Sequence, residues 1–348
     1  MFFLLRSSRR PRFVPRRLLS AGLQVDGDDL RQVPRFLSRP PSVALLGAPQ
    51  ELGQPLAGTA RGPALLRKAG LREMLASIGW RVEDRGDVAM MELSSVSASS
   101  WSAAQREAVL QGSRRLFERA KEAHLDGRLV VALGGDHSIS CGTVAAALAA
   151  RPRTRVLWVD AHADANTPET SPSGNVHGMP VAYLLGLAET QFLDFPRLPP
   201  SRLAYVGLRD LDLAEKKLLR HLKARGTFVA TMTDVDAFGI GHVMRAAFDS
   251  LGYAPDDDAT ADDRPPLHLS YDVDAVDPQH APATGTAVRG GLSFREAHYI
   301  CEAAWATGAL GSMDIVEVNE SLADAAHAQQ TVNLAASLVA SACGDAIL

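Results

Sequence analysis

The sequence has few of the features that mark membrane, disulfide-rich or nucleic-acid-binding proteins. It has no apolar run of roughly 18 residues or more, the length that a membrane-spanning helix needs, so we expect no membrane insertion. Its three cysteines, Cys141, Cys301 and Cys343, lie far apart and form no CxxC pair. They predict reduced thiols rather than a disulfide framework or a zinc knuckle. No basic stripe follows the N-terminal segment, which argues against a nucleic-acid partner.

Acidic residues are also absent from the N-terminal segment. Residues 1–20 hold no Asp, Glu or Lys but contain six arginines, Arg6, Arg9, Arg10, Arg12, Arg16 and Arg17. Setting these six aside changes the formal net charge of the chain from −4 to −10. An arginine-rich, acid-free segment with serines is typical of a mitochondrial transit peptide, so we predict that residues 1–22 direct the protein to the mitochondrial matrix. The alternative is a basic tail on a cytoplasmic protein.

The rest of the chain has the composition and the alternating pattern of a globular α/β protein, with 46% hydrophobic and 22% charged residues overall. Strands are predicted at Ser42–Leu46, Leu129–Leu133, Arg155–Val159, Leu203–Val206, Thr227–Ala230, Leu267–Tyr271 and Met313–Val318. Helices are predicted at Ala60–Ile78, Ala103–Leu125, Thr143–Ala150, His177–Leu187, Leu213–Ala224, Ile240–Leu251, Phe294–Ala306 and Leu322–Ala342. This alternation predicts a three-layer α/β fold, with a mostly parallel sheet of about eight strands and helices on both faces. No linker interrupts residues 42–348, which we expect to form one domain.

Ligand-type side chains follow three of the predicted strands. They lie in Gly134-Gly135-Asp136-His137-Ser138, Asp160-Ala161-His162-Ala163-Asp164 and Asp272-Val273-Asp274. In open α/β sheets, ligands bind at the carboxyl ends of the strands. Side chains at i and i+2 lie on one side of an extended backbone, so the last two segments each direct a set of ligands one way. One such motif alone is usually a loop, but three at strand ends of one domain indicate a site.

Four carboxylates gathered at buried strand ends repel one another and are costly to desolvate. They are therefore protonated, spread apart, or neutralised by cations. Two divalent ions would balance the four charges of Asp160, Asp164, Asp272 and Asp274. An oxygen-rich set with only two imidazoles favours Mn²⁺ or Mg²⁺ over zinc, and the imidazoles favour Mn²⁺. Paired metals about 3.5–4 Å apart activate a bridging water as hydroxide.

The three segments resemble the signature motifs of the ureohydrolase family, and the resemblance extends from Ser42 to about Cys343. It implies a binuclear manganese centre with the ligands His137, Asp160, His162, Asp164, Asp272 and Asp274. In this interpretation His137 and Asp164 belong mainly to one metal and His162 to the other. Asp160 and Asp272 bridge the two, and Asp274 completes the first site.

Finer features resemble the arginase branch of that family. They are Asp164–Pro168 with Ser171–Gly178, Gly207–Asp212, Pro282–Thr286 and Asp314–Asn319. The resemblance implies hydrolysis of L-arginine to L-ornithine and urea. It assigns the α-carboxylate to Asn166 and Ser173, the α-ammonium to Asp212 and the guanidinium to Glu317. Thr286 would support either Glu317 or the guanidinium, and His177 would transfer protons. These side chains suit those roles, since the first two are neutral donors, Asp212 is an acceptor and histidine titrates near neutrality.

Two other functions stay open from the sequence. In the first, the chain is a hydrolase whose substrate is agmatine or another guanidino compound. In the second, it is a non-enzymatic arginine-binding protein on this fold. Loss of metal ligands would favour the second, and none of the expected ligands is missing. The family resemblance also implies a homo-oligomer, with a trimer expected.

Overall fold

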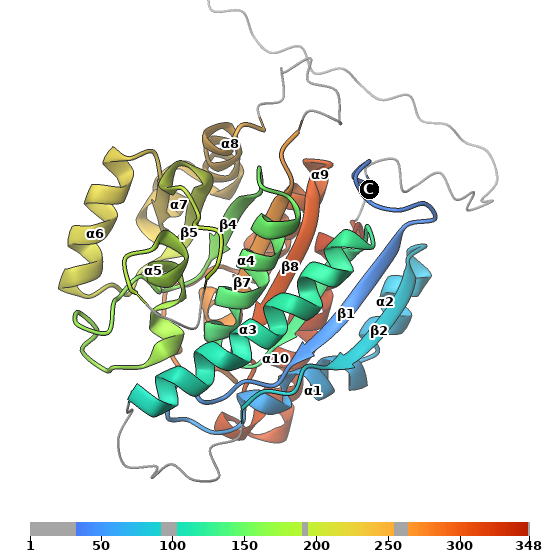
Figure 1. Cartoon of the computed structure of the whole chain (residues 1–348), viewed down its shortest axis with the longest axis horizontal. Helices are drawn as coiled ribbons and strands as arrows, with labels where there is room; N and C mark the ends of the chain where they lie inside the picture. The colour runs from blue at the N-terminus through green and yellow to red at the C-terminus, as the bar shows by residue number, and fades with distance from the viewer. Residues whose placement is uncertain (1–32, 92–102, 190–193, 254–263, 347–348) are drawn as a thin grey trace, which may run out of the picture.

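An eight-stranded sheet in the order β2-β1-β3-β8-β7-β4-β5-β6 forms the centre of the molecule (Figure 1). The computed structural model describes residues 33–91, 103–189, 194–253 and 264–346, so the expected transit peptide lies outside the described residues. Every strand pair is parallel. The strands are β1 (Ser42–Ala48), β2 (Arg81–Asp87), β3 (Leu129–Gly134), β4 (Arg155–Val159), β5 (Leu203–Leu208), β6 (Phe228–Thr231), β7 (Leu267–Asp272) and β8 (Leu310–Val316). The predicted fold class is therefore confirmed.

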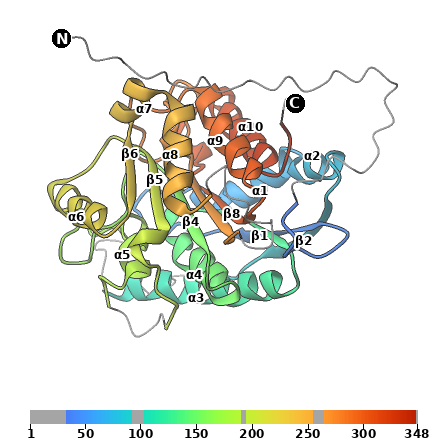
Figure 2. The ribbon, with the colours of Figure 1, turned by 90° about the horizontal axis from the view of Figure 1, so that it is seen from above.

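Helices cover both faces of the sheet (Figure 2). One face carries α3 (Ala103–Leu125), α4 (Ser140–Ala150) and α5 (Pro180–Leu185), and α6 (Leu213–Ala224) lies beside the β6 edge. The other face carries α1 (Gly62–Lys68), α2 (Leu71–Ser77), α7 (Met232–Phe238), α8 (Ile240–Leu251), α9 (Phe294–Ala306) and α10 (Ala325–Ala342). In β1, Val43 and Leu45 join one apolar cluster while Ala44 and Leu46 join another. A continuous apolar strand is expected when both faces are covered.

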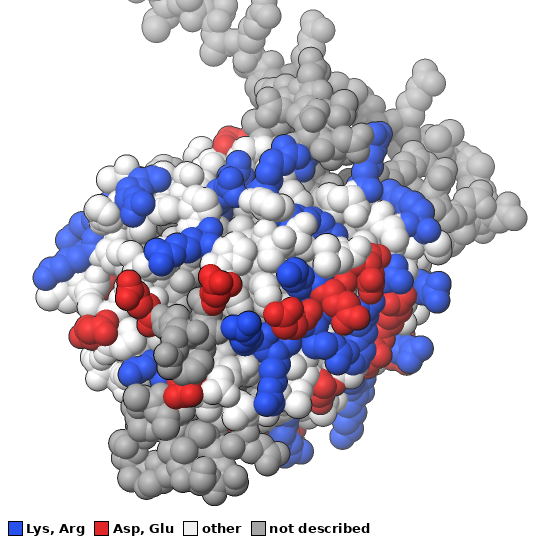
Figure 3. Space-filling view, in the orientation of Figure 1, with Lys and Arg blue, Asp and Glu red and all other residues white. Residues whose placement is uncertain are grey.

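The sequence analysis missed β2, because Arg81–Asp87 is polar and largely exposed. This strand forms one edge of the sheet, and acidic and basic side chains interleave over that side of the molecule (Figure 3). Arg67 of α1 contacts Asp84 at 2.8 Å and Asp87 at 2.6 Å. Charged side chains on an edge strand discourage pairing with another chain. Ion pairs and backbone pairing with β1 therefore stabilise this strand, and its sequence lacks the apolar alternation by which strands are predicted.

Several helix boundaries also differ from the predictions. The helix predicted over Ala60–Ile78 is divided into α1 and α2 at Gly70, whose φ of 83° is left-handed. The helix predicted from His177 begins at Pro180, after a 3-10 turn, and the one predicted from Leu322 begins after the N-cap Asp324. Helix α7 was not predicted. Within the described ranges, no helix combines the length and the apolar character needed to cross a membrane.

The sheet order brings the important strand ends together. Strands β3, β8, β7, β4 and β5 are consecutive neighbours in the sheet, although β3 and β8, and also β7 and β4, are far apart in the chain. Parallel strands end at the same edge, so the segments after these strands gather there. Leu133 of β3 pairs with Ile315 of β8, and Val159 of β4 pairs with Tyr271 of β7. The predicted ligand segments therefore converge at the middle of the sheet.

Candidate active site

The structure brings all six predicted metal ligands together at the ends of β3, β4 and β7. They form two overlapping groups, one of His137, Asp160 and Asp164 and one of Asp160, His162 and Asp274. The ligand atoms of each group lie within 4.8 Å of one another, and Asp160 is common to both. Asp272 joins the first group, because its Oδ2 lies 3.1 Å from His137 Nδ1. A shared carboxylate between two groups is the arrangement that a pair of metal ions requires.

The ring of His137 shows that the first group suits a cation. Its Nδ1 lies 3.0 Å from oxygens of both Asp160 and Asp164, yet it has no hydrogen-bond partner among the described residues. The ring is buried against Trp158, with 4.3 Å between the ring centroids. A buried nitrogen that faces three carboxylates without a hydrogen bond has the position of a metal ligand.

The carboxylates themselves are crowded enough to oppose their own ionisation. Burial and the charge of Asp160 raise the pKa of Asp164 to about 6. Burial and the charges of Asp274 and Asp160 raise the pKa of Asp272 well above its ordinary value. Divalent cations would remove this repulsion, so the donor set fits a metal pair.

The second group corrects the expected place of Asp274. Its Oδ2 lies 3.1 Å from His162 Nδ1, so Asp274 belongs with His162 and not with the His137 group. The reason is that β7 ends at Asp272, and Val273–Ala275 form a 3-10 turn in which Asp272 accepts the Asp274 N–H at 2.7 Å. The side chain of Thr286 donates to Asp274 Oδ2 at 2.7 Å. Thr286 therefore supports this carboxylate, a partner that the sequence analysis did not predict, and its expected support of Glu317 or the guanidinium stays a prediction.

Glu317 follows β8 and lies beside the His137 group. Its Oε1 accepts the backbone N–H of His137 at 2.9 Å and the ring Nδ1–H of His177 at 2.8 Å. Its Oε2 is buried and has no partner in the described part of the chain. Oε1 thus fixes the carboxylate, and Oε2 makes none of these hydrogen bonds.

His177 is held by both its backbone and its ring. Its backbone N–H donates to the carbonyl of Gly53 at 3.0 Å, and Gly53 N–H donates to Asp136 Oδ2 at 2.7 Å. Burial opposes the charged imidazolium, but the Glu317 carboxylate outweighs this effect and raises the pKa of His177 to about 9. The imidazole is therefore protonated at neutral pH and lies where it can give a proton to a bound group.

Backbone strain is concentrated at the same place. Among the residues that the structure describes, the non-glycine residues with positive φ are Asp164, at 50°, and Glu317, at 65°. A left-handed conformation at a non-glycine residue costs about 1–3 kcal/mol and persists where the surrounding structure enforces it. Asp164 belongs to the first ligand group, and Glu317 accepts hydrogen bonds from His137 and His177.

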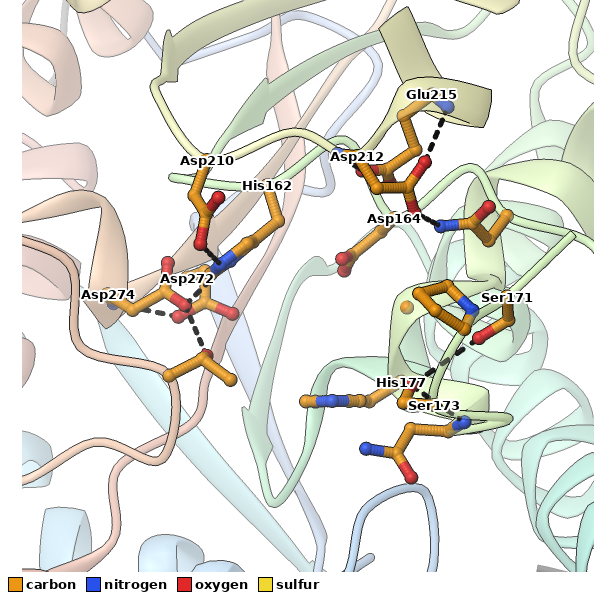
Figure 4. Close-up of a pocket in the computed structure, with 15 residues that line it drawn as sticks. His162, Asp164, Ser171, Ser173, His177, Asp210, Asp212, Glu215, Asp272 and Asp274 are labelled. Atoms are coloured by element: carbon orange, nitrogen blue, oxygen red, sulfur yellow. Dashed lines mark hydrogen bonds and ion pairs between the residues drawn. The ribbon is translucent and has the colours of Figure 1, made fainter.

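A cavity of about 280 Å³ opens above the metal ligands (Figure 4). Four of the five predicted substrate-binding residues, Asn166, Ser173, Asp212 and Thr286, line it together with the predicted catalytic His177, whereas Glu317 is not among its lining residues. Asn166 Nδ2 donates to Asp212 Oδ2 at 2.6 Å, which leaves its second amide hydrogen for another acceptor. Asp212 Oδ1 caps α6 by accepting the N–H groups of Ala214 and Glu215 at 2.7 and 2.9 Å. The helix itself therefore fixes the Asp212 side chain at the cavity wall.

With this geometry in view, comparison with known proteins decides the family. A model described as the arginase family matches residues 41–344. The chain belongs to the arginase family. It is thus a ureohydrolase, which acts on carbon–nitrogen bonds of amidines.

Individual arginases match over most of the chain. The arginase of Glaciozyma antarctica is 41% identical and covers 94% of this chain and 96% of its own length. Mouse arginase-1 is 40% identical, with 88% and 94% covered. A solved structure of Bacillus caldovelox arginase has a TM-score of 0.79 at 33% identity and covers 88% of this chain and 100% of its own. The Entamoeba histolytica arginase, solved with L-ornithine, has a TM-score of 0.74 at 29% identity and covers 86% and 98%.

This arginase-family chain has further cavity residues that the sequence analysis missed. Glu215 and Asp210 both line the cavity. Burial, followed by the charges of Asp164 and Asp212, raises the pKa of Glu215 to about 7. The spacing of a capping box, an acid at the N-cap and Glu three residues later, was the signal for Glu215. Asp210 had no comparable signal.

Proposed function

We propose that this chain hydrolyses the guanidinium group of L-arginine to L-ornithine and urea, with a pair of manganese ions. One observation carries the proposal. Two ligand groups share Asp160 beneath a cavity, and Glu317, whose Oε2 is buried without a partner among the described residues, accepts the backbone N–H of His137 beside the first group. The identity with relatives named arginase supports the choice of substrate, as does the L-ornithine held by the Entamoeba histolytica relative.

Manganese fits the donor set better than zinc does. The proposed ligands are the carboxylates of Asp160, Asp164, Asp272 and Asp274 and the imidazoles of His137 and His162. Carboxylate-rich sites favour Mn²⁺ or Mg²⁺, and the imidazoles shift this preference toward Mn²⁺. When bound, such a pair supplies a nucleophile at neutral pH by lowering the pKa of water.

The residues of this chain would orient the substrate and supply a proton. Glu317 Oε2 accepts from the guanidinium and holds its carbon above the ligand groups, an effect of position. The protonated imidazole of His177, 2.8 Å from Glu317, delivers a proton to the leaving amine. Departure of the amine breaks the carbon–nitrogen bond.

At the mouth of the cavity, three side chains would recognise the amino-acid end of arginine. Asn166 and Ser173 donate to the α-carboxylate, and Asp212 accepts from the α-ammonium. Agmatine lacks the carboxylate, and a buried polar group left unpaired costs about 1–3 kcal/mol. This set therefore favours arginine over agmatine, the alternative substrate.

Urea release from arginine and agmatine, measured side by side with Mn²⁺-loaded protein, tests the proposal. We expect arginine to be preferred by about 10²–10⁵-fold in kcat/KM, as in sites that hydrogen-bond a group absent from the competitor. Equal rates would contradict the arginine assignment while keeping the metal centre. Metal analysis giving one ion per chain at saturation, or full activity after chelation, would contradict the metal pair.

We further propose that the chain is imported into mitochondria, on the strength of the arginine-rich, acid-free residues 1–22. A C-terminal fluorescent fusion should colocalise with mitochondria and become cytosolic when these residues are deleted. A cytosolic signal from the intact chain would contradict import. The homo-oligomer expected from the family resemblance, a trimer, is tested by light scattering, and a monomeric mass would contradict it.

A further inference from the structure

A line of polar side chains runs beneath the metal ligands, inside the layer between the sheet and α4. His268 and Ser270 lie two residues apart on β7, and Ser312 and Asp314 lie two residues apart on β8. The register pairs His268 with Ser312 and Ser270 with Asp314. Each of these four residues is at most 2% exposed. Burial of a carboxylate and an imidazole in an apolar layer is costly, so their hydrogen bonds must offset that cost.

The hydrogen bonds form a chain that ends at a proposed metal ligand. His268 Nε2 lies 3.0 Å from Asp314 Oδ2, and the Ser270 hydroxyl donates to Asp314 Oδ1 at 2.6 Å. Ser270 Oγ also lies 2.9 Å from His137 Nε2. Since the proton of Ser270 points to Asp314, its oxygen accepts from His137, which places the hydrogen of His137 on Nε2. The lone pair of His137 Nδ1 then faces the three carboxylates.

Asp314 is the centre of this chain. Besides Ser270 and His268, the hydroxyls of Thr143 and Ser140 on α4 donate to it at 2.5 and 3.2 Å. Burial acts to raise the pKa of Asp314, but its hydrogen bonds and nearby positive charge, chiefly from His268, together outweigh burial and lower that pKa. A carboxylate with this many donors stays ionised and acts as a fixed acceptor. The second nitrogen of His268, Nδ1, lies 2.8 Å from Ser312 Oγ, which fixes the ring.

We propose that His268 is a positioning residue for the metal centre. Through Asp314 and Ser270 it holds His137 in the tautomer and orientation that present Nδ1 to a cation. The inference rests on the proposed metal centre and deepens it, because His268 touches no ligand and lies two hydrogen bonds beyond Ser270. Partners of this kind outside the ligand shell typically change metal affinity by about 10- to 100-fold.

Ser270→Ala in the full-length protein tests the link nearest the metal. Mn²⁺ affinity is measured by competition with a chelating dye, which resolves two binding steps. We expect one step to weaken by about 10- to 100-fold, because the Nε2–H of His137 loses its acceptor. Wild-type affinity in both steps would overturn the proposal.

A matched pair of variants tests His268 itself. In His268→Asn the amide is too short to reach Asp314, whereas in His268→Gln an amide nitrogen lies near the position of Nε2. We expect the asparagine variant to lose Mn²⁺ affinity in the same step as Ser270→Ala, and the glutamine variant to recover most of it. Because the two residues act in series, His268→Asn should have no further effect in the Ser270→Ala background, whereas independent residues would have additive effects.

Thermal unfolding of the metal-free variants separates positioning from a purely structural role. A structural role would lower the unfolding temperature and leave Mn²⁺ affinity unchanged, and that result would overturn the proposal. If His268→Asn fails to fold, Ser270→Ala still tests the link to His137, and wild-type Mn²⁺ affinity in that variant would overturn the proposal. Urea release by the wild type is measured in parallel. An inactive wild type that keeps this affinity pattern would reject the proposed reaction and retain the role of His268.

Discussion

Replacement of Asp212 by serine isolates the recognition of the substrate ammonium. Asp212 has two functions in the structure, since Oδ1 caps α6 and Oδ2 lies beside Asn166 at the cavity wall. Serine is also a favourable N-cap, so Asp212→Ser removes the charge and keeps the cap. Asp212→Ala removes both and serves as the comparison. It should lower stability by about 0.5–2 kcal/mol, measured by thermal unfolding, while the serine variant stays near the wild type.

The expected loss follows from one charged hydrogen bond. Such bonds contribute about 1.5–3 kcal/mol, so kcat/KM for arginine should fall by about 10- to 150-fold in Asp212→Ser. The same variant is assayed with the 2-hydroxy analogue of arginine, which keeps the carboxylate and the guanidinium but has no ammonium. Because that analogue offers only a neutral hydroxyl to the lost charge, its kcat/KM should fall less than that of arginine, by about 2- to 12-fold, as for one hydrogen bond of about 0.5–1.5 kcal/mol.

Urea release and metal content are measured for each protein and substrate. An equal loss on arginine and on its 2-hydroxy analogue would refute the reasoning. That result would mean that Asp212 acts by holding Asn166, to which it is joined by a 2.6 Å hydrogen bond, rather than by binding the ammonium. Reduced metal content in Asp212→Ser would likewise contradict the assignment, since Asp212 is not among the proposed ligands.

Four further predictions follow from the site. Asp160→Asn should lose metal and urea release together, because Asp160 is common to both ligand groups; retained metal by elemental analysis would show that it is not shared. Glu317→Gln should lower kcat/KM for arginine by about 10- to 150-fold with metal content unchanged, since Oε2 loses the charge that meets the guanidinium. His177→Ala should lower kcat by about 10²–10⁴-fold with metal retained, and metal loss would identify it as a ligand. In metal-free protein, the pKa of His177 is raised from 6.5 to about 9, which stabilises the folded state by about 3 kcal/mol below pH 6.5. This stabilisation is lost as the pH rises toward 9. Denaturant unfolding at both pH values should therefore show the free-energy difference between wild type and His177→Asn shrink at the higher pH.

The sequence predicted the fold and the segments that carry the metal-ligand side chains because both depend on local patterns, whereas the substrate-binding residues came from the family resemblance and stay predictions. Apolar runs such as Arg155–Val159 predict strands buried on both faces, and helices between them predict a parallel sheet. Parallel strands end at one edge, so His137, Asp160 and Asp272 could be brought together from three segments without coordinates. The strand β2 was not predicted because it lies at an exposed edge and is stabilised by ion pairs. Its charged residues show no apolar alternation in the sequence.

Tertiary structure alone decided how the site residues are paired. The sequence could not show that Asp274 turns toward His162, because the alternation of side chains ends with the strand and a 3-10 turn follows Asp272. It could not show that Thr286 supports Asp274, since their contact depends on the path of a loop. The polar chain from His268 to His137 likewise depends on the register of β7 and β8. By itself the sequence determined which chemical groups reach the strand ends. The packing of strands, turns and helices decided which atoms meet, because hydrogen bonds and metal ligation depend on distances that only the folded chain sets.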